Sequence, residues 1–220
     1  ITDTLNSVIK EEVIDLSDIG LTEEAIKGVG RIYIVACGSA YHVGMAAQYV
    51  LEDMAGIPVR VELASEFRYR SLLLEPDSLV MIVSQSGETA DSLAALREAK
   101  KRGVKTLGIV NVVGSSIARE ADSVFYTLAG PEISVATTKA YSTQLVLIHL
   151  LMLCIAQAQG KMSEQQIAHE IECLERIPEQ LKFMLSNVEQ VQFLASQFFN
   201  GRDMFFIGRN VDYALSLEAS

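Results

Sequence analysis

The chain has 220 residues, of which 50% are hydrophobic and 21% are charged. This composition is globular and excludes a wholly disordered chain, while the length allows one large domain or one domain with a remainder. Lys and Arg number 18 against 28 Asp and Glu, and the resulting formal net charge of −10 argues against nonspecific binding to nucleic acid.

The N-terminal segment, Ile1–Asp18, is acidic and mixed in character, unlike a secretory signal peptide. The chain opens with Ile1 instead of methionine, so we expect a piece of a longer protein. Five short β-rich runs follow, and each is almost continuously apolar, which is typical of strands covered on both faces. The predicted strands are Arg31–Ala36, Val59–Leu63, Ser78–Val83, Thr106–Val110 and Ser123–Leu128.

Helical patterns separate these strands, at Tyr41–Ala55, Thr89–Arg102 and Ser115–Ala121. The alternation of strand and helix predicts an α/β fold with a five-stranded parallel sheet and right-handed crossovers. After Gly130 the pattern becomes mainly helical. The elements predicted there are helices at Val135–Gln159, at Glu164–Asn187 with a break or kink at Pro178, at Val188–Phe199 and from Val211 to Ser220, and a strand at Met204–Ile207.

The longest apolar stretch, Leu145–Ala156, has 12 residues and contains His149. A membrane-spanning helix needs about 20 residues, so we predict a buried core helix and no membrane partner. The cysteines Cys37, Cys154 and Cys173 show no metal-ligand spacing, and the histidines are scattered. We therefore expect reduced thiols in a cytoplasmic protein, and no metal site.

The late strand repeats an earlier design. Met204–Gly208 and Tyr33–Gly38 each join an apolar strand to a glycine, and a helix with a tyrosine follows, almost one domain length apart. We interpret the repeat as the opening of a second, similar domain. The alternative is that any α/β fold contains such strand–glycine–helix units.

The clearest candidate binding site is Ser84–Thr89 (SQSGET), between the third strand and its helix. Backbone N–H groups at a helix start are unpaired and partially positive, so they can hold an anion. Ser84, Ser86 and Thr89 add hydroxyls and Gln85 adds an amide. Because the loop has no Lys or Arg, it suits a phosphomonoester held reversibly by neutral donors. The alternative is an ordinary helix with Ser86 as its N-cap.

A second candidate is Ala36–Ala40, at the end of the first strand, where ligands bind in a doubly wound sheet. Ser39 and the amides after Gly38 would face that crevice. Cys37 fits a small buried residue better than a nucleophile, because the sequence offers it no evident base.

Two further segments carry polar groups. Gly130–Lys139 enters the long helix. Thr137 and Thr138 can cap this helix, and Val135 and Ala136 can lay their backbone against a ligand. Lys139 is expected in a salt bridge or in solvent. Ala64–Arg70 packs three charges among two aromatic residues, which fits a subunit contact and a plain surface helix equally well.

Together these motifs resemble the isomerase half of the glucosamine-6-phosphate synthase family (glutamine–fructose-6-phosphate aminotransferase, isomerizing). The matching stretches are Ala36–Gly44, Glu62–Arg70, Ser84–Leu93, Asn111–Glu120, Gly130–Gln144 and Phe206–Ser220. The resemblance implies tandem sugar isomerase (SIS) domains, each a three-layer α-β-α sandwich. The implied divisions are a lead-in segment at 1–22, a first SIS domain at 23–163, linking helices at 164–199 and the truncated start of a second SIS domain at 200–220.

The resemblance also implies a reaction for the parent enzyme. It makes glucosamine 6-phosphate from fructose 6-phosphate and ammonia, which a glutaminase domain releases from glutamine, with no cofactor and as a homodimer. The implied phosphate contacts are Ser84, Gln85, Ser86 and Thr89, and the sugar contacts are Ser39, Val135 and Thr137, with Cys37 and Gly38 as backbone neighbours. Ala40 stands where the family often has Ser or Thr, so one hydroxyl donor is lost.

No catalytic residue is expected within this chain, because the implied general base, ring-opening His and Schiff-base Lys lie beyond Ser220. Neither Glu218 nor Lys139 matches those positions. Moving a proton between sugar carbons needs a base, so we expect binding without turnover. Two alternatives stay open: a deglycase or other aldose–ketose isomerase built on SIS domains, and a non-catalytic sugar-phosphate sensor.

Overall fold

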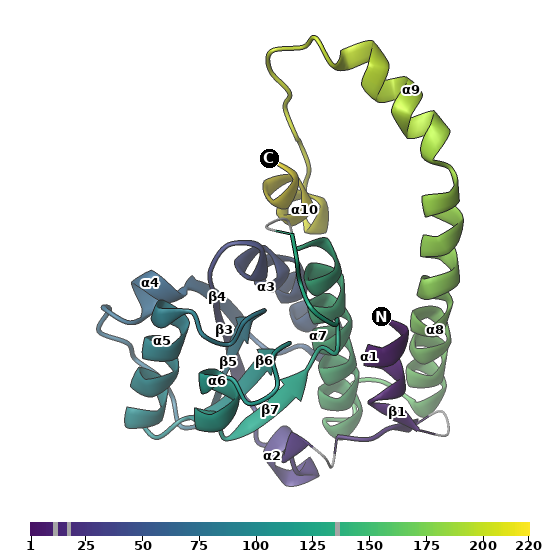
Figure 1. Ribbon diagram of the computed structural model, residues 1–220. Coiled ribbons are helices and arrows are strands. Elements are labelled where there is room, and N and C mark those ends of the chain that lie inside the picture. The colour runs from purple at the N-terminus through teal and green to yellow at the C-terminus, as the bar shows by residue number, and fades with distance from the viewer. Residues whose placement is uncertain (11–12, 17–18, 135–136) are drawn as a thin grey trace.

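The computed structural model describes residues 1–10, 13–16, 19–134 and 137–220. Its centre is a five-stranded, all-parallel sheet in the order β4-β3-β5-β6-β7 (Figure 1). The strands are β3 (Arg31–Ala36), β4 (Val59–Leu63), β5 (Ser78–Ser84), β6 (Lys105–Val110) and β7 (Ser123–Tyr126). All five lie where the sequence predicts them, although β7 ends at Tyr126 instead of Leu128.

Helices cover both faces of the sheet, which explains why its strands are almost continuously apolar. The helices of the sandwich are α3 (Ser39–Val50), α4 (Ala64–Phe67), α5 (Ala90–Lys101), α6 (Ser116–Glu120) and α7 (Thr138–Ala158). Ile32 and Ile34 of β3 pack in one core cluster with α3 and α7, whereas Tyr33 and Val35 pack in a second cluster with α4, α5 and α6. This is the predicted α/β fold, and its three layers agree with the implied sandwich.

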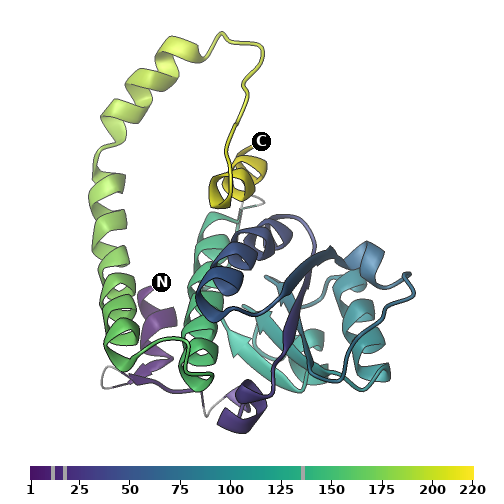
Figure 2. The same cartoon turned by 180° about the vertical axis from the view of Figure 1, so that it is seen from behind.

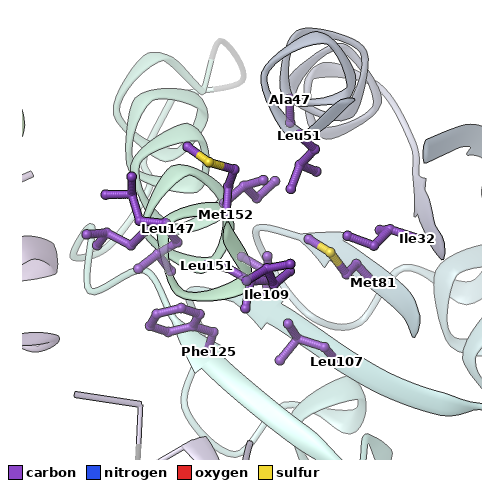
Figure 3. Close-up of a cluster of buried hydrophobic side chains, with 14 of the residues drawn as sticks. Ile32, Ala47, Leu51, Met81, Leu107, Ile109, Phe125, Leu147, Leu151 and Met152 are labelled. Atoms are coloured by element: carbon purple, nitrogen blue, oxygen red, sulfur yellow. The ribbon is translucent and has the colours of Figure 1, made fainter. Parts of the chain in front are cut away.

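The helix α7 is the core helix that the apolar stretch predicts. Of its 21 residues, 13 are buried. Leu147, Leu151 and Met152 belong to the same cluster as Ile109 and Phe125 of the sheet (Figure 3). By length and composition alone α7 could cross a membrane. Each buried large side chain contributes about 1.5–3 kcal/mol, so α7 instead holds one layer of the sandwich against the sheet.

The N-terminal segment packs beside α7. It contains α1 (Thr2–Asn6), a two-stranded antiparallel pair of β1 (Ile9–Lys10) and β2 (Val13–Ile14), and α2 (Glu23–Lys27). The buried Thr4 hydroxyl donates to the carbonyl of Thr127 at 2.6 Å, just after β7. The lead-in segment therefore joins the core of the sandwich.

The C-terminal third leaves the sandwich and returns to it. Helix α8 (Glu164–Ser186) and helix α9 (Val188–Phe198) arch away, and α10 (Val211–Ala219) lies back against α3 (Figures 1 and 2). Of the predicted break or kink at Pro178, the break is wrong, because α8 runs through this residue as one helix, and the kink stays a prediction. A proline removes one backbone hydrogen bond of a helix. The hydrogen-bonded turns before and after Pro178 keep the helix continuous.

The predicted strand at Met204–Ile207 is also wrong. These residues precede α10 and belong to no strand. They are exposed, with Phe205 at 88% and Ile207 at 90%. A strand needs a neighbour to receive its backbone hydrogen bonds, and none of the described strands lies beside this segment. An apolar run therefore stays extended there without becoming a strand.

Candidate functional site

The sheet has one topological switch point, between β3 and β5. From β3 the chain crosses to β4 on one side and then returns to β5 on the other side of β3. Ligands of open α/β sheets bind beyond the carboxyl ends of the strands at such a point. A cavity of about 300 Å³ lies there. Its lining residues are Cys37, Gly38, Ser39, Ala40, Val83, Ser84, Gln85, Ser86, Thr89, Ser92, Thr137 and Gln144.

Internal hydrogen bonds fix the loop that follows β5. The Ser84 hydroxyl accepts from the N–H of Gly87 at 3.1 Å and lies 3.4 Å from the hydroxyl of Thr89. The Ser86 hydroxyl accepts from the N–H of Glu88 at 3.2 Å. These contacts hold the loop in one shape before any ligand arrives, so binding does not have to order it.

Gly87 makes this loop shape possible. Its φ is +66°, and a Cβ atom added there would lie 2.1 Å from the Ser115 hydroxyl. Any other residue would therefore strain the backbone and also collide with the start of α6. The glycine lets the loop lie against α6 while its polar groups line the cavity.

Three helix N-termini border the cavity, and none is capped by a side chain. Gly38 precedes α3, Thr89 precedes α5 and Thr137 precedes α7, and no side-chain hydrogen bond caps any of the three helices, so the prediction that Thr137 caps its helix is wrong. By contrast, Thr22 caps α2 and Ser163 caps α8 in a capping box. The alternative of Ser86 as an ordinary N-cap therefore fails, because Thr89 holds that position. Uncapped N–H groups beside a polar cavity are suited to an anion.

Charged side chains are turned away from the cavity. None of its described lining residues is charged. Glu88, the one acidic residue of the loop, accepts from the N–H of Ser116 at 2.7 Å, and the hydrogen bonds at Ser116 lower the pKa of Glu88. Lys139 is exposed and donates to the Pro131 carbonyl instead of entering a salt bridge or pointing freely into solvent. Neutral donors and helix N-termini would therefore hold an anion here.

The structure brings together eight of the nine predicted site residues: Cys37, Gly38, Ser39, Ser84, Gln85, Ser86, Thr89 and Thr137. The ninth, Val135, lies outside the described residues, as does Ala136. Ser92 and Gln144 line the same cavity and were not among the predicted site residues. Helical spacing offered a signal for both, because Ser92 follows Thr89 by three positions and Gln144 follows Thr137 by seven.

The segment Ala64–Arg70 lies apart from the cavity and stabilises the second core cluster. Phe67 is fully buried, and its ring meets Tyr33 edge-on at 6.5 Å between centroids. Arg68 pairs with Asp91 at 2.6 Å. Tyr69 is 79% exposed. The segment therefore packs into the core through Phe67 and presents Tyr69 to solvent.

Helix α10 closes against α3 beside the cavity. Glu218 Oε2 lies 2.7 Å from His42 Nδ1, and His42 follows the cavity residue Ala40 by two positions. Tyr141 of α7 is buried nearby, and burial, with a smaller contribution from the Glu218 carboxylate, raises its pKa. Glu218 is thus paired with His42.

The fold and the site define a class: doubly wound α/β proteins with a neutral, polar cavity at the switch point of the sheet. The chain belongs to the SIS domain family, whose sequence profile matches residues 25–154.

Known proteins extend this similarity to the whole chain. It is 48% identical, over its full length, to a glutamine–fructose-6-phosphate aminotransferase (isomerizing) from Caldanaerobacter subterraneus, but spans only 36% of that relative. The C-terminal domain of glucosamine-fructose-6-phosphate aminotransferase from Francisella tularensis superposes with a TM-score of 0.94 at 37% identity, over 99% of this chain and 61% of that one. Glucosamine-6-phosphate deaminase from Thermotoga maritima, at 23% identity and a TM-score of 0.70, shares the fold.

Proposed function

We propose that this chain is part of the isomerase region of a glutamine–fructose-6-phosphate aminotransferase, and that its cavity binds fructose 6-phosphate or glucosamine 6-phosphate. The observation that carries the proposal is the convergence of Ser39, Ser84, Ser86 and Thr89, with three uncapped helix N-termini, around one uncharged cavity. The names and full-length similarity of the relatives support the same substrate class.

The proposed binding mode divides the cavity between phosphate and sugar. Ser84, Gln85, Ser86 and Thr89, at the start of α5, form the phosphate cradle. Ser39 and Thr137 contact sugar hydroxyls, and Val135 contacts the sugar as the family resemblance implies. Cys37 and Gly38 are the backbone neighbours of Ser39 at the sugar. A cavity of about 300 Å³ is at the lower end of the range that small-molecule sites occupy. Neutral donors hold a dianion reversibly, as an enzyme that must release its product requires.

The same proposal extends to the longer protein. Residues 23–163 form the first SIS domain after a lead-in segment (1–22), residues 164–199 link it to a second, and residues 200–220 begin that second domain. The glutaminase domain supplies ammonia, the protein works as a cytoplasmic homodimer without a cofactor, and the base that moves the proton lies outside this chain. This piece therefore binds substrate but does not convert it.

Calorimetric titration tests the proposal. Fructose 6-phosphate and glucosamine 6-phosphate are titrated into the chain and into its Ser86→Ala variant, with fructose as the ligand that lacks phosphate. We expect saturable binding of both sugar phosphates, no detectable binding of fructose, and a twofold to tenfold weaker affinity in Ser86→Ala, since one hydrogen bond contributes about 0.5–1.5 kcal/mol. A folded chain that binds neither sugar phosphate contradicts the proposal.

A further inference from the structure

Gln144 is a largely buried residue whose amide lines the cavity and has no hydrogen-bond partner among the described residues. It lies in the apolar helix α7 and is 2% exposed, and its side chain makes no hydrogen bond to any described residue. Its neighbour Thr143 is equally buried, but its hydroxyl donates to the carbonyls of Lys139 and Ala140, each at 3.0 Å. Its amide atoms are not fully buried, so they reach the space of the cavity, and no protein group occupies their hydrogen-bonding capacity there. Such a group in the wall of a polar cavity points to a ligand.

Ser92, in a helix on the other face of the sheet, also lines the cavity without a hydrogen-bond partner for its side chain among the described residues. It is 1% exposed, its hydroxyl is buried, and that hydroxyl has no hydrogen-bond partner among the described residues. Other helical serines are satisfied differently: Ser142 and Ser216 each donate to the carbonyl four residues before them. Ser92 follows Thr89 by one turn and lines the same cavity. Two polar side chains that lack a hydrogen-bond partner among the described residues, one from α5 and one from α7, thus line the same polar cavity.

We propose that Gln144 hydrogen-bonds the sugar part of a phosphorylated sugar and that Ser92 adds a hydroxyl to the phosphate cradle; this deepens the proposed function and rests on it. An amide offers both a donor and an acceptor, which matches a sugar hydroxyl, itself both. Ser92 stands at the start of α5, among the donors of the phosphate loop. Gln144 stands two turns inside α7 from Thr137. The bound ligand would then supply the hydrogen-bond partners that Gln144 and Ser92 lack among the described residues.

Calorimetric titration of this chain separates the two roles, with fructose 6-phosphate and inorganic phosphate as probes. Gln144→Leu removes the amide at similar volume, and we expect it to weaken fructose 6-phosphate about threefold to tenfold while leaving inorganic phosphate unchanged. Ser92→Ala should weaken both probes about twofold to tenfold. Because the Gln144 amide makes no hydrogen bond to a described residue, the ligand-free thermal midpoint of Gln144→Leu should be close to that of the unaltered chain; Gln144→Met is a second, unbranched variant.

The outcomes are distinguishable. Unchanged affinity of Gln144→Leu and Gln144→Met for fructose 6-phosphate overturns the role of Gln144, and so does an equal loss for inorganic phosphate. Unchanged binding of both probes by Ser92→Ala overturns the role of Ser92. If the unaltered chain is folded and binds neither probe, the proposed function fails, and this inference fails with it.

Discussion

Two regions of the molecule differ in whether their apolar side chains are buried or exposed. The sandwich (the sheet with helices α3 to α7) buries its apolar side chains in two clusters, one on each face of the sheet. The arm (residues 179–210: the end of α8, α9 and the segment before α10) is exposed at every position. Its exposed apolar residues include Leu185, Phe193, Phe198 and Phe205.

The difference teaches which structures a chain can form without a partner. An α-helix satisfies its backbone within one segment, so α9 exists although none of its residues is buried. A strand satisfies its backbone only through a neighbour, so Met204–Ile207 stays unpaired. Helices without a packed face are nevertheless marginal in water, and the arm is therefore the weakest part of the molecule.

Hydrogen exchange should give the largest contrast between the regions. The amides of Leu79–Val83, in the central strand β5, open only with global unfolding, whereas those of Met204–Ile207 have no strand partner. We expect protection to differ on the order of 10³-fold or more, as measured by mass spectrometry after timed labelling. Slow exchange at Phe205 that persists on dilution would contradict an uncovered arm, whereas slow exchange only at high concentration would indicate self-association.

Core truncation should give the next largest effect. Leu151 is fully buried in α7, whereas Leu185, in α8, is 72% exposed. Leu151→Ala should lower the free energy of unfolding by about 2–5 kcal/mol, and the matched Leu185→Ala by no more than about 0.5 kcal/mol. Urea denaturation monitored by circular dichroism measures both. A comparable loss in Leu185→Ala would mean that the arm packs against something in solution.

The same comparison explains how far sequence could predict this molecule. Five strands and most helices were predicted correctly, because each local pattern has its packing partner within the chain. Met204–Ile207 has the same local pattern and no partner, so that prediction failed. Most of the residues that line the cavity were predicted, because they lie at strand ends and helix starts. Gln144 was not predicted: its helical spacing from Thr137 was a signal, but its place in the cavity wall depends on the packing of α7 against the sheet.

A glycine pair tests whether the phosphate loop is shaped before ligand binds. Gly87 and Gly103 both have positive φ, +66° and +76°, but only at Gly87 would a Cβ collide, with Ser115. Gly103→Ala should cost about 1 kcal/mol from backbone strain alone. Gly87→Ala should cost more and also weaken binding of fructose 6-phosphate at least about tenfold, because the loop must move. Thermal melts and calorimetry measure the two effects; a Gly87→Ala variant with unaltered binding would contradict a preformed loop.

The smallest expected effect is a pH dependence that arises where α7 of the sandwich packs against α8, away from the arm. Burial lowers the pKa of His149 below 6.5, its ordinary value, and outweighs the hydrogen bond and charge of Glu170, which lies 3.2 Å away and raises it. As the pH falls through 6.5, the unfolded chain therefore takes up a proton before the folded chain does, so stability is full above pH 6.5 and declines towards the folded pKa. His149→Gln should flatten this part of the profile of unfolding free energy against pH.

Glu170→Gln, which removes the partner that favours the charged ring, should lower the His149 pKa further in an NMR titration. A higher pKa in Glu170→Gln would mean that burial does not control this histidine.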